Sequence, residues 1–426
     1  MSAHLLAFWL MLPLFFLECS NEVSSETAEH VGAATEQTAQ PTNQWKTQEP
    51  LVTEKNWQNV WFTAIKGTGE EAHGHHLLAT NDGGFLQIGE TGKSRTSARI
   101  LAVKVDANGS LLWSKEIGKK GHNLGNSSIE LDDGYWLVGA ENQDTTLIKL
   151  DKNTGNILIK NTINLGGSDA IEHLIEQDGK LYAVGYKNAQ DPNNTFFTEG
   201  EGLIIRFDRT GVLEKTQSLS GHLAQGYRIA GHKGNFIVAG LTPYASDYGV
   251  MKIDNNFRTL WAKTYGGTED DHNFAMDAAR DGAIYLSGHT LSGTANWDVF
   301  TIKLDQNGTE LWAQTTGNPR GFSPRCIHDE AWDLKVLPSG EVLVIAGTGD
   351  EYRSYSAKQN GEVSDIWRAL LIKYASNGEL LSQSTFGPSD NETDWAGEAL
   401  ALAKNGDVVL GIDNGSFGFL RLRATK

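Results

Sequence analysis

The chain has 426 residues, with 53 Asp or Glu against 36 Lys or Arg, and its formal net charge is −17 at pH 7. This negative charge argues against binding to nucleic acid or to an anionic lipid surface, because both need a basic face. Of the 2 Cys residues only Cys326 lies in the body of the chain, so we expect no intramolecular disulfide there and a stability that depends on a large core.

The N-terminus predicts export. Residues 5–17 form an apolar run that is too short to span a membrane and is typical of a signal peptide. Cys19 follows this run, so residues 1–19 are interpreted as a signal peptide that ends at a lipidated cysteine. Residues 20–55 are rich in Ser, Thr, Glu, Gln and Asn and predict a disordered tether. We expect an outer-membrane lipoprotein, periplasmic or at the cell surface, or a secreted protein, with membrane contact only through the lipid.

The rest of the chain repeats one pattern seven times: an apolar run, a basic residue, an apolar residue and usually Asp. The basic residues of the pattern are Lys104, Lys149, Arg206, Lys252, Lys303, Lys373 and Arg421. They recur at intervals of 45 to 70 residues, and periods of this length with strand-like segments are typical of β-propellers. The sequence therefore predicts an all-β fold, a seven-bladed β-propeller over residues 56–426, and a monomer.

Each repeat reads as four strands. A first strand runs into a turn such as Asp178-Gly179 or Asp281-Gly282, and these dipeptides indicate hairpins because both central residues adopt positive φ. The second strand ends in Gly, the third carries the basic residue, and the fourth opens on Leu-Trp, as at Leu260-Trp261. Most Trp residues are therefore expected between blades.

The last repeat ends at Lys426 without a fourth strand, while residues 60–67 have the form of one. We expect this N-terminal segment to complete the last blade, which would close the ring and remove its exposed strand edges. The repeats, with residues 261–312 as the cleanest copy, resemble the bacterial propeller repeats of the Asp-rich, Trp-terminated type. That resemblance implies the fold and little about activity.

Carboxylates that recur at one repeat position are interpreted as structural. Asp169, Asp271, Asp329 and Asp394 stand at or near the start of the first strand of a repeat, where we expect them to cap turns. A glycosidase pair drawn from them is an alternative, but such a pair needs two carboxyl groups in different environments.

Residues that break the repeat concentrate in the fifth and sixth units. His272 and His289 lie at the facing ends of two adjacent strands, Tyr352 lies in the longest loop, and Arg368 replaces an Asp of the other units. Further cations lie in two insertions nearby: Arg320, Arg325, Arg353 and Lys358. The guanidinium groups of the arginines suit carboxylate or sulfate oxygens, although all four cations could equally be solvated loop charges.

This set, His272, His289, Tyr352 and Arg368, resembles the active site of the seven-bladed polysaccharide lyases that cleave ulvan, a sulfated uronic acid polymer. The resemblance implies β-elimination on an anionic polysaccharide, with Arg368 offsetting the uronate charge. His272 or Tyr352 would take the C5 proton and the other, or His289, would protonate the leaving oxygen. No cofactor is required for this catalysis. The alternative function is a noncatalytic surface propeller that binds glycan or protein.

Three other groups remain open. A second constellation of His122, Asn142 and Tyr186 is weaker because Glu201, rather than Arg, begins the next strand. The pair Cys326 and His328 could serve as half of a metal site, so structural zinc or calcium is considered, against a buried thiol beside an ordinary histidine. His73, His75 and His76 are expected to face inward, as ligand or metal residues or as polar surface.

Overall fold

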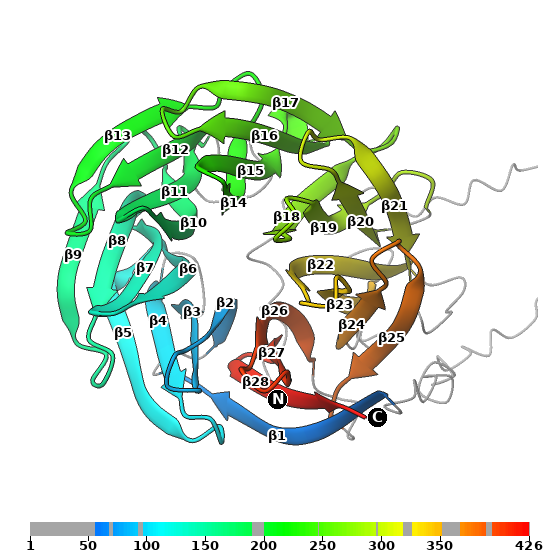
Figure 1. Cartoon of the computed structure of the whole chain (residues 1–426). Coiled ribbons are helices and arrows are strands. Elements are labelled where there is room, and N and C mark those ends of the chain that lie inside the picture. The colour runs from blue at the N-terminus through cyan, green and yellow to red at the C-terminus, as the bar shows by residue number, and fades with distance from the viewer. Residues whose placement is uncertain are drawn as a thin grey trace, which may run out of the picture.

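The computed structural model describes residues 56–67, 71–92, 97–189, 200–245, 247–294, 297–317, 326–351, 367–388 and 394–425. Together these residues form seven four-stranded antiparallel sheets arranged as a ring, so the prediction of a seven-bladed all-β propeller is confirmed (Figure 1). The predicted signal peptide and tether lie outside the described residues. No helix in the described ranges is long and apolar enough to cross a membrane.

The first four blades follow one another along the chain. Blade one contains β2 (Ala72–Ala79), β3 (Phe85–Thr91), β4 (Ala98–Val105) and β5 (Leu111–Gly121), and blade two contains β6 (Asn123–Leu131), β7 (Gly134–Glu141), β8 (Asp144–Leu150) and β9 (Ile157–Ile163). Blade three contains β10 (Ala170–Gln177), β11 (Lys180–Lys187), β12 (Glu201–Phe207) and β13 (Leu213–Ser218). Blade four contains β14 (Gln225–His232), β15 (Asn235–Leu241), β16 (Tyr248–Asp254) and β17 (Thr259–Tyr265), with the short 3₁₀ helix Pro243–Ala245 between its middle strands.

The remaining three blades complete the ring. Blade five contains β18 (Asp271–Ala278), β19 (Ile284–Thr290), β20 (Asp298–Leu304) and β21 (Glu310–Thr316), and blade six contains β22 (Cys326–Val336), β23 (Val342–Glu351), β24 (Arg368–Tyr374) and β25 (Leu380–Phe386). Blade seven contains β26 (Ala396–Leu402), β27 (Val408–Asp413), β28 (Phe417–Ala424) and, as its outer strand, β1 (Trp57–Ile65). The first and last strands of the described chain thus pair in one sheet, with Trp57 opposite Ala424.

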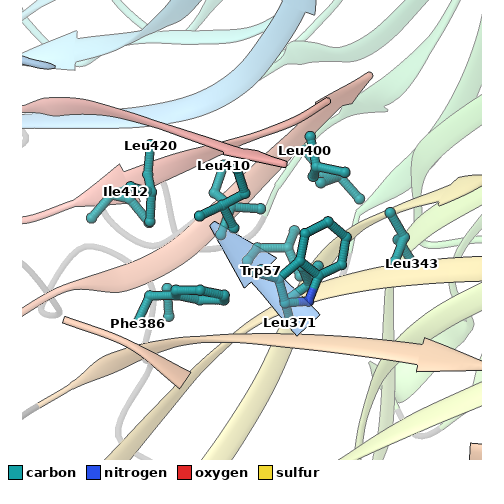
Figure 2. Packing of buried hydrophobic residues seen from close by; sticks show 12 residues of the cluster. Trp57, Leu343, Leu371, Phe386, Leu400, Leu410, Ile412 and Leu420 are labelled. Atoms are coloured by element: carbon teal, nitrogen blue, oxygen red, sulfur yellow. The ribbon is translucent and has the colours of Figure 1, made fainter. Parts of the chain in front are cut away.

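The core is divided among the junctions between blades. Each pair of neighbouring blades shares one cluster of buried apolar side chains, so no blade buries its faces alone. At the junction of blades six and seven, Trp57 from β1 packs with Leu371, Phe386 and Leu410 (Figure 2). The N-terminal strand therefore contributes core as well as hydrogen bonds.

The repeated polar residues hold turns and neighbouring blades together. Lys104 Nζ contacts Asp82 in the hairpin turn of its own blade at 2.9 Å. Asp305 Oδ1 accepts backbone N–H bonds from Asn307 and Thr309, both at 2.8 Å. Trp113 Nε1 donates to the Lys152 carbonyl of the next blade at 3.0 Å, as expected for a Trp between blades.

The hairpin turns differ in one detail from the sequence prediction. Asp178 and Gly179 both have positive φ, at 51° and 76°. At the corresponding Asp281-Gly282 turn only the glycine does, with φ at 92°. The dipeptides located the turns correctly, but most need the conformational freedom of glycine at one position only.

Candidate functional site at the propeller axis

Each innermost strand carries one β-bulge at an equivalent place. The strands β2, β6, β10, β14, β18, β22 and β26 surround the centre of the ring (Figure 1). Their extra, unpaired residues are His75, Asn126, Glu172, Tyr227, Phe274, Trp332 and Glu398. A bulge turns the side chain of the extra residue away from the direction that regular strand pairing would give it. Side chains of these extra residues contact one another between blades two and three, four and five, and five and six. Together they form the axial ring.

A glycine in the second strand permits the bulge in most blades. At Gly288 an added Cβ would lie 1.8 Å from the His272 carbonyl oxygen, and at Gly139 it would lie 1.9 Å from that of Leu124. The same close approach occurs at Gly89, Gly185 and Gly240. From the sequence, these glycines were interpreted only as the ends of second strands, and His75 was the one residue of the axial ring named as a candidate. These glycines were the sequence signal for the bulges, because a glycine inside a strand often marks a place where a neighbouring backbone approaches closely.

One side of the axial ring is aromatic. Phe274 lies between Tyr227 and Trp332, with ring centroids 5.2 Å and 4.6 Å away. All three side chains are buried, and the Trp332 Nε1 donor has no hydrogen-bond partner in the described structure. Arg228 of blade four reaches across to the Trp332 carbonyl at 3.3 Å, which ties blades four and six together. We call these three residues the aromatic arc.

The other side of the ring is polar. Asn126 Nδ2 donates to Glu172 Oε1 at 3.1 Å, and His75 Nε2 lies 2.6 Å from Oε2 of Glu90 on β3. Burial raises the pKa of Glu172 to about 7, although the charges of Arg228 and His75 act in the opposite direction. Glu172 therefore sits at a pKa where it can hold or release a proton near neutral pH.

A group of buried carboxyl groups adjoins this polar side, and we call it the axial carboxylate cluster: Glu90, Glu330, Glu398 and Asp413. Burial, with the charges of Asp413, Glu330 and Glu90, raises the pKa of Glu398 well above its ordinary value. His73 Nδ1 lies 2.8 Å from Asp413 Oδ2. Burial lowers the pKa of His73, but Asp413, Glu90 and Glu71 outweigh it and bring the value to about 9.

The predicted histidine pair lies beside the aromatic arc. His272 and His289 face each other across β18 and β19, with Nδ1 of the first 3.3 Å from Nε2 of the second. The ring of Trp297 lies 4.7 Å from both imidazoles, and Phe274 lies 5.3 Å from His289. Burial, then the neighbouring His272 and His328, lowers the pKa of His289 well below its ordinary value. A neutral His289 can accept or donate one proton, and its Nδ1 has no partner in the described structure.

Arg368 lies on the neighbouring blade. It stands opposite Thr348, which in turn stands opposite Asp329, in one row across blade six. Arg368 shares its face of β24 with Leu370, which packs against blade five. The Asp329 N–H donates to the Trp297 carbonyl at 2.8 Å, so this row adjoins the histidine pair. Tyr352, the fourth predicted residue, lies outside the described residues, as do Arg320, Arg325, Arg353 and Lys358.

The described surroundings of the histidine pair are more acidic than the sequence suggested. Asp298 follows Trp297 directly in the chain, and Asp329 of blade six donates its N–H to the Trp297 carbonyl, so two carboxylates adjoin the histidine pair. Burial raises the pKa of Asp298 to about 6. An acidic setting favours neutral or cationic ligands over polyanions.

Three of the four recurring carboxylates have the structural role expected of them. Asp169 accepts backbone N–H bonds from Thr145 at 2.6 Å and Leu165 at 2.9 Å, and Asp271 accepts one from Gly267 at 2.7 Å. Asp394 Oδ1 likewise accepts the Trp367 N–H at 2.9 Å.

Asn142 and Glu201 of the second constellation contact residues of their own blades. Tyr186 is buried, and Asn142 adopts a φ of 52° with its N–H donating to Asn123 Oδ1. Glu201 lies 3.4 Å from Lys187.

The metal prediction remains a prediction. Cys326 and His328 stand on alternate residues of β22, but the Cys326 side chain lies outside the described structure. His328 Nδ1 lies 3.8 Å from Glu330 Oε1. Among the described residues, no three His, Cys, Asp or Glu side chains are arranged to hold a metal ion.

Comparison with known proteins supports the fold and no more. No family profile and no curated protein matches the sequence. The WD40 β-propeller domain of Doa1 superposes with a TM-score of 0.53 at 14% identity, covering 87% of this chain and 97% of that one. The Neurospora crassa Pan2 WD40 domain gives 0.55 at 11%, covering 88% and 97%. A catalytically inactive histidine-to-alanine variant of virginiamycin B lyase from Staphylococcus aureus, with quinupristin, gives 0.53 at 11%, covering 86% and 99%.

Proposed function

We propose that this chain is a glycan-binding propeller whose ligand lies at the end of the axis marked by His272, His289 and Trp297. The observation that carries the proposal is a series of ring contacts that joins the aromatic arc to the histidine pair and Trp297. We call these rings the aromatic surface, although all of them except Trp297 are buried. Aromatic rings with a few convergent polar groups are typical of ligand sites, and propeller loops on a rigid frame commonly build them. Trp297 is the partly exposed member of this surface, so it would stack on the sugar.

The hydrogen-bonding groups around this surface suit sugar hydroxyls. Among the described residues Trp332 Nε1 is an unpartnered donor, and His289 Nδ1, also unpartnered, can donate or accept. A hydroxyl group both donates and accepts, so one sugar ring can satisfy donors and acceptors together. Buried polar atoms left without partners cost about 1–3 kcal/mol each, which a ligand or ordered water would recover.

The test is a glycan-binding screen followed by titration calorimetry. Trp297→Ala should weaken binding of any glycan found by up to ~10-fold, because a stacked aromatic contact contributes about 0.5–1.5 kcal/mol beyond the area that it buries. Trp312→Ala, which removes a Trp on the outer strand β21, should leave the affinity unchanged. A glycan that binds equally to both variants would place the site elsewhere.

A second candidate is a lyase acting on a uronic acid polysaccharide such as ulvan, and one observation favours it. The His272–His289 pair, at 3.3 Å, lies at the junction with the blade that carries Arg368. In this proposal one imidazole takes the C5 proton, Arg368 stabilises the enolate-like carboxylate, and the other imidazole or Tyr352 protonates the leaving oxygen. The similar virginiamycin B lyase depends on a histidine, so the fold is compatible with such chemistry.

The acidic surroundings place the lyase second, since Asp298 and Asp329 beside Trp297 would repel a uronate. Incubation with ulvan decides between the two functions. A lyase develops the ultraviolet absorbance of an unsaturated uronyl product, and His272→Ala and Arg368→Ala abolish it. A binding propeller gives no such product with the wild-type protein.

We also propose that the protein works outside the cytoplasm, at the cell surface, in the periplasm or secreted. This rests on the apolar run at residues 5–17 and on Cys19. A glycan ligand fits that location.

A further inference from the structure

Tyr244 is the most exposed large apolar residue among those that the structure describes. It is 85% exposed, and the next of them, Val212, is 57% exposed. The others are aliphatic, and each lies on the outer strand of a blade or directly before it. Tyr244 lies instead in the connection between β15 and β16, at the end of the ring where the first strand of each blade begins. The repeat therefore does not account for this exposed aromatic ring.

The backbone at Tyr244 is strained. Its φ is 71° and its ψ is 7°, in the left-handed region that bulky residues rarely adopt. Phe257 also has a positive φ, at 67°, but its ring is fully buried, so core packing can compensate for the strain. The ring of Tyr244 gains no comparable burial. Strained residues of this kind are found preferentially at ligand-binding and active sites.

Hydrogen bonds close the loop that carries Tyr244. The Thr242 N–H donates to the Asp247 carbonyl at 3.3 Å, and the Asp247 N–H donates to Thr242 Oγ1 at 3.2 Å. Pro243, directly before Tyr244, has a fixed φ. The loop therefore presents the aromatic ring in a restricted position, and a ligand that stacks on the ring would lose little free energy in ordering the loop.

This loop adjoins the proposed glycan site. The corresponding connection of blade five, between β19 and β20, carries Trp297. A Cβ added to Gly266 would lie 2.4 Å from Asp247 Oδ1 and 2.5 Å from Asp271 Oδ2, so these two carboxyl groups flank one glycine. Asp247 ends the loop of Tyr244, and Asp271 directly precedes His272 in the chain. The two aromatic side chains thus lie on neighbouring loops at the same end of the ring.

We infer that Tyr244 is a second aromatic platform, on which another sugar of the glycan bound at Trp297 stacks. The inference rests on the proposed glycan-binding function and names its ligand class, a neutral linear oligosaccharide. Aromatic rings suit the apolar faces of sugars. Asp247 beside one platform and Asp298 beside the other would repel a uronate, which favours a neutral sugar.

Calorimetry with neutral oligosaccharides tests the inference. The probes are cello-, xylo- and laminari-oligosaccharides and any other neutral glycan found in the screen, each as a disaccharide and as a hexasaccharide. The hexasaccharide should bind ~5-fold more tightly than the disaccharide or better, because only the longer chain reaches both rings. Tyr244→Ala should remove most of this gain and change the disaccharide affinity by less than ~2-fold. Tyr244→Phe should retain the gain, as should Leu260→Ala, which alters a 53% exposed residue on the outer strand of the same blade.

A glycine variant separates a binding role from a structural one. Glycine adopts a positive φ without strain. Tyr244→Gly should therefore lose the same affinity for the hexasaccharide as Tyr244→Ala and be at least as stable as the wild-type protein in urea. A ring needed for folding would instead make Tyr244→Gly less stable, and that result would overturn the inference.

The remaining outcomes distinguish the second platform from the function on which it rests. An undiminished length gain in Tyr244→Ala would overturn the second platform and leave glycan binding at Trp297 intact. A screen in which only charged glycans bind would overturn the neutral ligand class. If no glycan of any class binds, the proposed function itself is refuted.

Discussion

Replacement of Glu172 by Gln should stabilise the protein above neutral pH and leave its stability almost unchanged at pH 4.5. Glu172 is the bulge residue of blade three, only 4% exposed, and its Oε1 accepts a 3.1 Å hydrogen bond from Asn126. Burial raises the pKa of Glu172 from 4.5 to about 7. The folded state therefore holds the proton more tightly than the unfolded state does.

The sign and size of the effect follow from that shift. Stability from the neutral carboxyl group is fully present below pH 4.5 and is lost as the pH rises to about 7. A difference of 2.5 between 7 and 4.5, at ~1.4 kcal/mol per unit, corresponds to about 3 kcal/mol as an order of magnitude. Gln cannot ionise and its Oε1 can accept the same bond from Asn126, so Glu172→Gln should recover most of this free energy of unfolding.

Urea unfolding at pH 4.5 and at a pH above 7 measures the difference. The exposed Glu176, on the same strand, provides the matched control, and Glu176→Gln should show no pH-dependent gain. If Glu172→Gln gains the same stability at both pH values, or loses stability at the higher one, the reasoning from burial is wrong.

Three further predictions concern ring closure, the bulges and export. Trp57→Ala should lower the free energy of unfolding by about 3–5 kcal/mol in urea titration, because the 8% exposed indole fills the junction of blades six and seven. The control is Val60→Ala on the same strand, where the side chain is 37% exposed and its loss should have little effect. Gly288→Ala should lower the free energy of unfolding by ~2 kcal/mol or more in the same assay, because the added Cβ would lie 1.8 Å from the His272 carbonyl oxygen and would displace that backbone. A loss below ~1 kcal/mol would contradict the bulge geometry. Mass spectrometry of the exported protein should find acyl chains on Cys19, and Cys19→Ser should release it from membranes; an unmodified Cys19 would rule out the anchor.

The fold was predictable because its signals repeat. Seven basic residues, from Lys104 to Arg421, each fall on the third strand of a blade, and the Asp and Trp residues of the repeat hold turns and neighbouring blades. A residue type that recurs at one spacing reports a physical requirement common to all blades. The pairing of β1 with β28 reflects the same rule, since residues 60–67 match the form of a fourth strand.

The site was only partly predictable because its residues differ from blade to blade. His272 and His289 were found because they interrupt the repeat at facing strand ends, and the register places them opposite each other. Glu398, Trp332 and Phe274 share one structural position, but a bulge shifts the alternation of side chains and hides that position from a period-two pattern. The charge of the site also depends on burial, which raises the pKa of Glu398 and is not visible in the sequence.

A crystal structure of the protein with the tightest-binding glycan of the screen tests the central claim most directly. We predict one sugar ring against Trp297, beside the histidine pair. A glycan bound on the outer strands, or anywhere else out of contact with Trp297, would contradict the account.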